Sequence, residues 1–531
     1  MASASSLQAR LSAALPQGVD VVAYHISTPP TSASALFAPV PGQSEETTHC
    51  ESHFLAISSP QRDDVKEVIV FAIEILIFTT QSLTTLFVSK ADSAGFSSRL
   101  NAPRQSPSVV AAITATFIEY LLGPRLSTTR VILSLFARSQ NQYLFPGSIE
   151  NAGKHVLDDC QLIKWWCRVT DRVLRLYSDK TDPPFRSTAH LVVPGCDKAE
   201  TRAFFPASSR QDLPSDPVWI NSYPVELLVA DTSRPPRHLV PRLPDDPKSR
   251  FLDDLDGDFM DDGGRWRSVK NLDQFWEMMS YRQECSAGRL VGFLWLVFSQ
   301  GQTSHASLAD LDQASYMGNT VAALAQESLP TPGNSQLGED GDLPVQPQPL
   351  SELEMIGELT SPPSSSPLER VHEELRNGSA EESTARASSI LAGAATNREP
   401  SQELSQQYQE TQGELVLDAA QYLTLMDHLL QTDFAGEELA AANTKSWIQK
   451  ALELSSIPRF GIPIRGRYVV AESGGLEKSA LPQVNVLTGI RKKRKAEAVD
   501  DGTAALDTTP NPSAPAVNTL AAGLLRKKPR S

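Results

Sequence analysis

The sequence predicts an α+β fold in which helices surround a mixed central β-sheet, with a long disordered insert and a disordered tail. Three observations support this prediction. Apolar runs of strand length are mixed with amphipathic helical stretches, without the strand–helix–strand rhythm of a doubly wound sheet. Six of the seven tryptophans fall in the first 300 residues. Later segments are rich in Ser, Pro, Gly, Gln and Glu, and such segments bury too little apolar surface to offset the entropy lost on ordering.

Strands are expected where short runs of apolar and β-branched residues end at turn-forming residues. The expected strands are Val19–His25, Val68–Phe78, Thr84–Ser89, Val131–Ala137, Pro217–Asp231 and Leu290–Phe298. The run that starts at Val68 is interrupted by Glu74 and is much shorter than the roughly 20 residues needed to cross a bilayer. We therefore expect a buried strand there and no membrane association.

Helices are expected where apolar residues recur at three- and four-residue steps. They are a short helix from Leu7 and the stretches Ser108–Leu122, Leu157–Tyr177 and Asn271–Glu284. The Leu157–Tyr177 helix carries Trp166, Val169 and Val173 on one face. Trp165 lies beside this face.

Four parts are expected along the chain. Residues 1–300 are expected to form the core of the domain, and residues 301–411 are expected to be a disordered insert. Residues 412–470 are expected to form a helical segment that completes the domain, and residues 471–531 are expected to be a disordered basic tail. In the helical segment, five apolar residues at helical spacing are expected to form one buried face: Val416, Ala419, Leu423, Met426 and Leu430. A second helix, Glu437–Leu452, follows, and we expect both to pack against the first 300 residues.

Charge and cysteine content narrow the class of protein. The net charge of −15 argues against general nucleic-acid coating and sequence-specific nucleic-acid binding; it suits a basic partner or simply provides solubility. Five scattered cysteines without a C-x-x-C pair indicate a reducing compartment and no metal site. Two basic runs in the tail, Arg491–Lys495 and Arg526–Arg530, have the composition of nuclear import signals, with a solvated basic tail as the alternative. The expected location is the nucleus.

Two other local motifs do not match their templates. Gly147–Lys154 resembles a phosphate-binding loop, but five residues separate its glycines and His155 stands where Ser or Thr belongs. Asp254, Asp256 and Asp258 resemble a calcium loop, but Phe259 replaces the required glycine and Arg265 the closing glutamate. We expect this acidic run, through Asp262, to be a solvated loop, with attraction of a basic partner as the alternative.

Two segments have an unusual composition. Phe136–Cys167 concentrates five aromatic rings around a glycine-containing connector, as a ligand-gripping segment would. Leu243–Phe251 reads L-P-D-D-P-K-S-R-F and places two carboxylates between two prolines, which stiffen the backbone. Together with F-V-S-K-A-D at Phe87–Asp92, these segments resemble the fungal histone acetyltransferases of the "regulator of Ty transposition" family. The resemblance covers about residues 60–300 and, more weakly, 413–530.

The resemblance implies a CBP-like acetyltransferase fold, acetyl-CoA as co-substrate and a set of site residues. The acetyl-CoA wall would comprise Ala91, Asp92, Ser93, Arg99, Phe136, Gln140, His155, Val156, Leu157 and Trp165. Tyr143 and Trp166 would line a tunnel for the substrate lysine, and Asp92 would also act in catalysis. Asp246 would be the acid/base carboxylate and Lys248 a lysine that becomes acetylated in the active site.

Each assignment has a structural alternative. Either Trp165 or Trp166 could be a core residue, because adjacent rings on a helix cannot point the same way. Asp245 could simply cap the following turn. Gln140 stands where the family has a small residue, so a backbone contact is favoured there.

The resemblance also implies the function. It predicts a chaperone-stimulated acetyltransferase for histone H3 in H3–H4, acting on the core lysine at position fifty-six and on tail lysines such as nine and twenty-seven. The partners would be histone chaperones of the NAP type and the anti-silencing type, in replication-coupled nucleosome assembly and genome stability. The alternative is an inactive relative that serves as a histone- or chaperone-binding scaffold.

Overall fold

A computed structural model describes residues 6–61, 66–103, 105–126, 130–178, 185–258, 260, 265–282, 285, 288–300 and 399–469. These residues all belong to one compact unit, Met1–Ala471. Most of the expected insert and the whole basic tail, with both expected import signals, lie outside the described residues. No described helix is long and apolar enough to cross a membrane.

Among the described residues, eleven strands form one mixed sheet, which confirms the predicted fold class. Its order is β10-β1-β3-β4-β5-β6-β9-β7-β8, with β11 beside β1 and β2 beside β3. In chain order the strands are β1 (Asp20–Ser27), β2 (Thr31–Ala33), β3 (Thr48–Ser59), β4 (Val68–Thr79), β5 (Leu83–Ser93), β6 (Arg130–Ala137), β7 (Phe185–Val192), β8 (Trp219–Ile220), β9 (Gly292–Gln300), β10 (Leu415–Val416) and β11 (Ile462–Arg465). The pairs β5–β6, β7–β8 and β1–β10 are parallel, and the others are antiparallel.

The helices pack against both faces of this sheet. In chain order they are α1 (Leu7–Ala14), α2 (Val109–Leu122), α3 (Asp159–Ser178), α4 (Lys198–Arg202), α5 (Val225–Leu228), α6 (Pro247–Asp258), α7 (Leu272–Met279), α11 (Gln402–Thr411), α12 (Ala419–Leu430) and α13 (Glu437–Ser455). Side chains alternate between the two faces of a strand. On β1, the His25 ring lies 5.2 Å from the Phe117 ring of α2, whereas the Tyr24 ring lies 5.9 Å from the Trp447 ring of α13.

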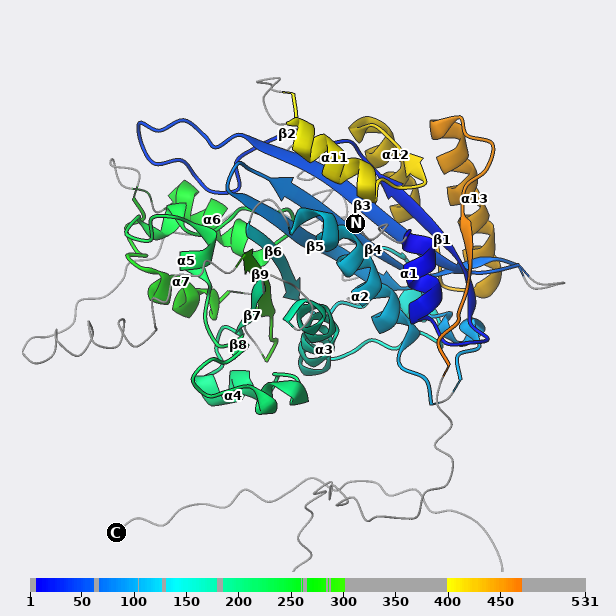
Figure 1. The fold of residues 1–531 in the computed structure, drawn as a ribbon, viewed down its shortest axis with the longest axis horizontal. Coiled ribbons are helices and arrows are strands. Elements are labelled where there is room, and N and C mark those ends of the chain that lie inside the picture. The colour runs from blue at the N-terminus through cyan, green and yellow to red at the C-terminus, as the bar shows by residue number, and fades with distance from the viewer. Residues whose placement is uncertain are drawn as a thin grey trace, which may run out of the picture. The chain divides into compact units, whose positions relative to one another are not determined.

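The C-terminal segment completes the domain. In Figure 1, α12 and α13 (yellow and orange) lie beside β1 and β3, which come from the first 60 residues. Trp447 is fully buried, and Thr444 accepts a hydrogen bond from the backbone of Ile69. In this structure α13 thus packs against strands from the first 300 residues.

Several local predictions differ from the structure. In Pro217–Asp231 only Trp219 and Ile220 form a strand, and a helical turn follows Pro224, because prolines cannot donate to a sheet. The acidic run was expected to be a loop, but Asp254, Asp256 and Asp258 lie in α6, where Asp256 binds Arg237 and Arg242. Asp261 and Asp262 lie outside the described residues. The strands β3 and β7 were not predicted. All twelve residues of β3 are buried although many are polar, so its sequence lacks a strand's simple alternation.

The buried face of α12 also differs from the predicted stripe. Its buried residues are Tyr422, Leu425, Met426 and Leu429, so only Met426 belongs to the stripe. Val416 lies in β10 before the helix begins, and Asp418 caps the helix at its N-terminus. The prediction started the helical repeat at Val416, before the cap. It therefore assigned the buried face of the helix to the wrong residues.

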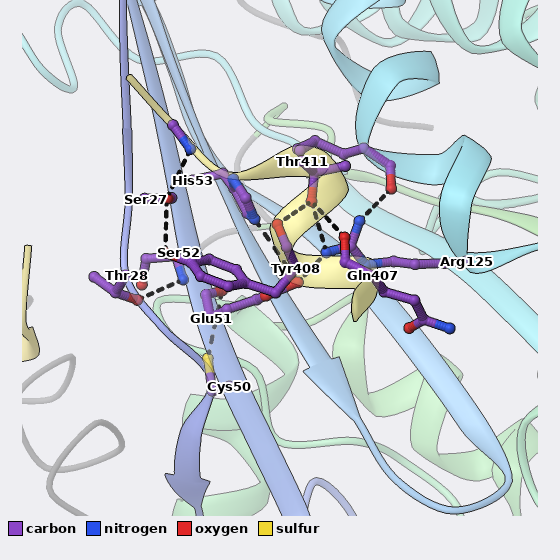
Figure 2. A network of polar contacts seen from close by, with 12 residues as sticks. Ser27, Thr28, Cys50, Glu51, Ser52, His53, Arg125, Gln407, Tyr408 and Thr411 are labelled. Carbon is purple, nitrogen blue, oxygen red and sulfur yellow. Dashed lines mark hydrogen bonds and ion pairs between the residues drawn. The ribbon is translucent and has the colours of Figure 1, made fainter. Parts of the chain in front are cut away.

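α11 lies within the part expected to be disordered. Ser401 caps this helix, and its buried residues Leu404, Gln407, Tyr408 and Thr411 follow helical spacing. Figure 2 shows their partners: Thr411 reaches Arg125, and the Tyr408 hydroxyl lies 3.0 Å from that of Ser27. This helix was not predicted because its sequence is largely polar, and its buried face includes polar side chains.

A buried charge network lies under α11. The Arg125 guanidinium is fully buried and pairs with Glu51 of β3. Beside them, His53 Nδ1 lies 3.2 Å from His25 Nε2. Burial holds the pKa of both histidines below its usual value; the neighbouring His53 adds to this effect at His25, whereas Glu51 opposes it at His53.

Trp447→Ala should lower the free energy of unfolding by about 3–5 kcal/mol, because it leaves a cavity among Tyr24, Phe54 and Phe460. Urea unfolding would measure the loss. Leu439→Ala on the same helix is the matched control, since Leu439 is 51% exposed and should change stability by no more than about 0.5 kcal/mol. Equal effects of the two variants would contradict the packing of α13.

Stability should fall as the pH drops below about 6.5, because the unfolded chain protonates His25 and His53 while the folded protein keeps them neutral. Each histidine can change the free energy of unfolding by at most about 1.4 kcal/mol per pH unit. Urea unfolding between pH 5 and pH 8 would show a smaller slope in His25→Gln. An unchanged slope would mean that His25 is protonated in the folded protein.

Candidate active site

The parallel strands β5 and β6 separate at their carboxyl ends. They pair only from Leu83 to Val88, whereas β5 continues beside β4 to Ser93 after a register shift near Glu74. The edge of β5 from Ser89 to Ser93 therefore does not pair with β6. Ligands of open α/β sheets bind at such carboxyl ends, where neighbouring strands diverge. The candidate residues Ala91, Asp92 and Ser93 lie on this edge, and Phe136 lies near the end of β6.

Asp92 holds in place the loop between β6 and α3, residues 138–158, which we call the Tyr143 loop. Its Oδ2 accepts hydrogen bonds from the backbone N–H groups of Tyr143 (2.7 Å) and Leu144 (3.0 Å). Its Oδ1 lies 3.0 Å from Lys154 Nζ, and both side chains are less than a tenth exposed. The geometry thus gives Asp92 a positioning contact with the expected tunnel residue Tyr143.

Tyr143 is a protonated phenol in a crowded, charged setting. Burial raises the pKa of Tyr143 to about 12, and the carboxylate of Asp245 adds to this effect, whereas Arg138 and Lys90 act against it. At neutral pH its hydroxyl can therefore donate a hydrogen bond. The structure thus brings together the expected residues Asp92 and Tyr143 and the P-D-D-P segment.

Asp246 and Lys248 form a closed pair at the start of α6. Asp246 Oδ1 accepts the Lys248 backbone N–H at 2.9 Å, and Oδ2 accepts Lys248 Nζ at 2.5 Å. Asp246, rather than Asp245, therefore caps the helix, and Pro247 follows at the first helical position, where its missing N–H costs nothing. Both side chains of the pair are fully buried.

Aromatic rings cover the Lys248 ammonium. Its Nζ lies 4.2 Å from the centre of the Phe293 ring and 5.5 Å from that of Trp295, distances at which a cation interacts with a π face. Burial lowers the pKa of Lys248, although Asp246 opposes this effect. A lysine in this setting loses its proton more readily than an exposed one, and the neutral amine is the nucleophilic form.

The two tryptophans of α3 pack edge to face, with ring centres 4.8 Å apart and planes at 82°. Trp166 is 5% exposed and belongs to the main core cluster, whereas Phe293 and Trp295 belong to a second cluster. Trp165 is half-buried. The structure thus gives Trp166 a core position and does not bring it into the cluster that covers Lys248.

The remaining expected residues differ in exposure. Gln140 and His155 are exposed, and Val156 and Leu157 are half-buried. Arg99 donates to the Lys66 carbonyl at 2.6 Å and lies 3.5 Å from Glu437, so it already has protein partners. Among the described residues, no group of three or more His, Cys, Asp or Glu side chains is arranged to hold a metal ion.

Lys90 is a site residue that the sequence analysis missed. Its Nζ lies 3.1 Å from Glu74 and 3.3 Å from Asp245. The sequence did contain a signal for this pairing. Glu74 is a charged residue within the apolar run of one strand, and Lys90 is a charged residue after the apolar residues of the next strand, in F-V-S-K-A-D. Opposite charges on neighbouring buried strands indicate a paired position.

The comparisons with known proteins define the class. A sequence model of the histone acetyltransferase KAT11-type domain matches residues 7–129 and 126–450. The chain is therefore a histone acetyltransferase.

Individual relatives define the family. The chain is 39% identical to histone acetyltransferase rtt109 of Aspergillus flavus over 98% of both chains. It is 30% identical to histone acetyltransferase rtt109 of Schizosaccharomyces pombe, over 54% of this chain and 70% of the relative. The crystal structure of Rtt109 from Aspergillus fumigatus matches with a TM-score of 0.64 and 37% identity, covering 88% of this chain and all of that one. The chain belongs to the Rtt109 family of fungal histone acetyltransferases, as its resemblance predicted.

Asp92→Asn should lower the free energy of unfolding by about 3–5 kcal/mol, because it leaves the buried Lys154 without its anion. An amide NH2 facing the N–H groups of Tyr143 and Leu144 would also repel that loop. Urea unfolding would measure the change. Asp216→Asn is the control: its ion pair with Arg186 is exposed and should contribute no more than about 1 kcal/mol. If Asp92→Asn is no more destabilising than the control, Asp92 does not hold the loop.

Proposed function

We propose that this histone acetyltransferase transfers acetyl groups from acetyl-CoA to lysines of histone H3 in H3–H4. The proposed targets are the core lysine at position fifty-six and tail lysines such as nine and twenty-seven, with chaperones of the NAP and anti-silencing types selecting among them in the nucleus. Family membership supports the histone substrate, and the net charge of −15 suits a basic partner. The observation that carries the proposal is the buried Asp246–Lys248 pair beside the Tyr143 loop.

Acetyl transfer to an amine requires that a lysine lose its proton, although its ordinary pKa is about 10.4. We assign Asp246 as the proton acceptor and Lys248 as an internal acetyl acceptor. The neutral Lys248 nitrogen forms a bond to the thioester carbonyl carbon, the carbon–sulfur bond breaks, and the CoA thiol leaves with a proton. Acetylated Lys248 carries no charge, so Asp246 Oδ2 would then be free to accept a proton from a histone lysine.

The co-substrate would bind along the edge of β5 that β6 leaves unpaired. A pantetheine arm carries two amides, and these can hydrogen bond to strand backbone near Ala91, Asp92 and Ser93. We assign the rest of the wall to Phe136, Gln140, His155, Val156, Leu157 and Trp165, with Tyr143 and Trp166 toward the substrate lysine. Arg99 would contact phosphate only by exchanging its present partner Glu437.

The alternative left open by the sequence, an inactive scaffold that binds histones or chaperones without transferring acetyl groups, is disfavoured by membership of the histone acetyltransferase family. Acetyl transfer from labelled acetyl-CoA to H3–H4, with each chaperone type present, separates the two. Binding without transfer by a folded preparation would support the scaffold.

Asp246→Asn should lower kcat by about 10²–10⁴-fold, the usual contribution of a general acid or base. Asn is also a good helix cap, and burial lowers the pKa of Lys248, so this lysine can give up its proton when its anion is removed. The variant should therefore still fold, although with a lower free energy of unfolding than the wild type. Steady-state kinetics on H3–H4 would measure kcat, and mass spectrometry of the Arg242–Arg250 peptide should find acetyl on Lys248 in the wild type. Asp253→Asn, at a 45% exposed side chain of the same helix, is the control and should retain activity. Normal turnover by folded Asp246→Asn would assign the proton transfer elsewhere.

A further inference from the structure

A line of buried polar contacts runs from the segment after the insert to the active-site loop. Tyr422 of α12 donates to Glu74 Oε1 at 2.7 Å. Glu74 of β4 and Lys90 of β5 are direct cross-strand partners, with Lys90 Nζ 3.1 Å from Glu74 Oε2. The same Nζ lies 3.3 Å from Asp245 Oδ2. The side chains of Glu74, Lys90 and Asp245 are 7%, 14% and 9% exposed, so solvent screens their charges little.

The last member of this line has an unfavourable backbone. Asp245 has φ +57°, in the left-handed region, which costs a residue other than glycine on the order of 1 kcal/mol. Such a conformation persists only where surrounding contacts impose it. The ion pair with Lys90 is one such contact, and the next residue is Asp246, whose carboxylate caps α6 and binds Lys248.

We propose that Lys90 is a positioning residue for acetyl transfer, which fixes the Asp245–Asp246 segment through its ion pair and connects it to α12 through Glu74 and Tyr422. The proposal rests on the proposed roles of Asp246 and Lys248. Lys90 does not touch the reacting atoms in this arrangement. It acts by holding the carboxylate of Asp246 in the orientation that reaches Lys248.

The charge state of Lys90 agrees with this role. Burial by itself would lower the pKa of Lys90, but the carboxylates of Glu74 and Asp245 outweigh it and raise the pKa above its usual value. Lys90 therefore remains a cation at neutral pH. It is a fixed charge rather than a proton acceptor or a second acetylated lysine, which would need the neutral amine.

The same C-terminal segment also fixes the other active-site loop. The ring of Phe434, between α12 and α13, lies 4.8 Å from that of Phe145, and its backbone N–H donates to the Pro146 carbonyl at 2.8 Å. At Gly147, φ is +72°, and a Cβ would lie 2.2 Å from Asp433 Oδ1, so only glycine fits there. The Tyr143 loop and the Asp246 loop are thus both fastened to the helices that follow the insert.

Lys90→Met, which keeps the length of the stem but removes the charge, should lower kcat about 10- to 100-fold, because small misplacements of catalytic groups have effects of this size. The KM for acetyl-CoA should stay within about two-fold, since the proposed wall is not altered. Lys90→Arg should restore part of kcat. Tyr422→Phe, which removes only the hydroxyl from the far end of the line, should give a smaller loss of the same kind.

Amide hydrogen exchange supplies a readout that does not depend on activity. Exchange should become faster at residues 243–250 in Lys90→Met and should recover in Lys90→Arg. Arg10→Met is the matched control, because it breaks the partly buried Arg10–Glu119 pair between α1 and α2, on the opposite face of the sheet. It should leave both kcat and exchange at residues 243–250 unchanged.

Three outcomes would overturn the proposal. Unchanged kcat and exchange in folded Lys90→Met would remove the positioning role. Faster exchange throughout the domain, with no recovery in Lys90→Arg and no effect of Tyr422→Phe, would mean that Lys90 serves only stability. A larger change in KM than in kcat would assign Lys90 to substrate binding. If the wild type itself transfers no acetyl to H3–H4, the proposed function fails, and the exchange experiment still decides whether Lys90 fixes the Asp246 loop.

Discussion

A carboxylate buried in this sheet must have a cation beside it, because an unpaired charge away from water costs several kcal/mol. Much of the architecture follows from that constraint. Among the described residues, buried or nearly buried carboxylate–cation pairs include Glu51–Arg125, Glu74–Lys90, Asp92–Lys154 and Asp246–Lys248. Three of these pairs join different elements, and only Asp246–Lys248 is local. A sheet covered on both faces leaves no solvent to stabilise these charges, so each pair restricts where its elements can lie.

Three of these pairs belong to the candidate site. Asp92–Lys154 holds the Tyr143 loop against the end of β5, and Glu74–Lys90 extends to Asp245 at the start of the Asp246 loop. The two loops meet where β5 and β6 separate. A reaction that moves a proton and an acetyl group needs groups held in a fixed geometry, and buried ion pairs provide strong directional contacts. The same contacts stabilise the fold and orient the residues of the site.

The segment after the insert belongs to this arrangement rather than being an appendage. α11 contacts the Glu51–Arg125 pair, α12 contacts Glu74, and the connection to α13 packs on Phe145. Tyr408, Tyr422 and Trp447 are each buried against residues from the first 60 to 80 of the chain. The segment from α11 to α13 thus completes the framework of the candidate site.

The sequence by itself determined the fold class, most long strands and helices, and, through its family motifs, the segments that carry Asp92, Tyr143, Asp246 and Lys248. These features depend on local periodicity, on caps and on short motifs, which are written in consecutive residues. Only the tertiary structure decided that β3 is a strand and α11 a helix, which face of α12 is buried, and that Lys90 faces Asp245. The physical reason is common to all of them: a polar residue can be buried only where a distant partner satisfies it, and the partner of Glu51 is 74 residues away, while that of Glu74 on α12 is 348 residues away.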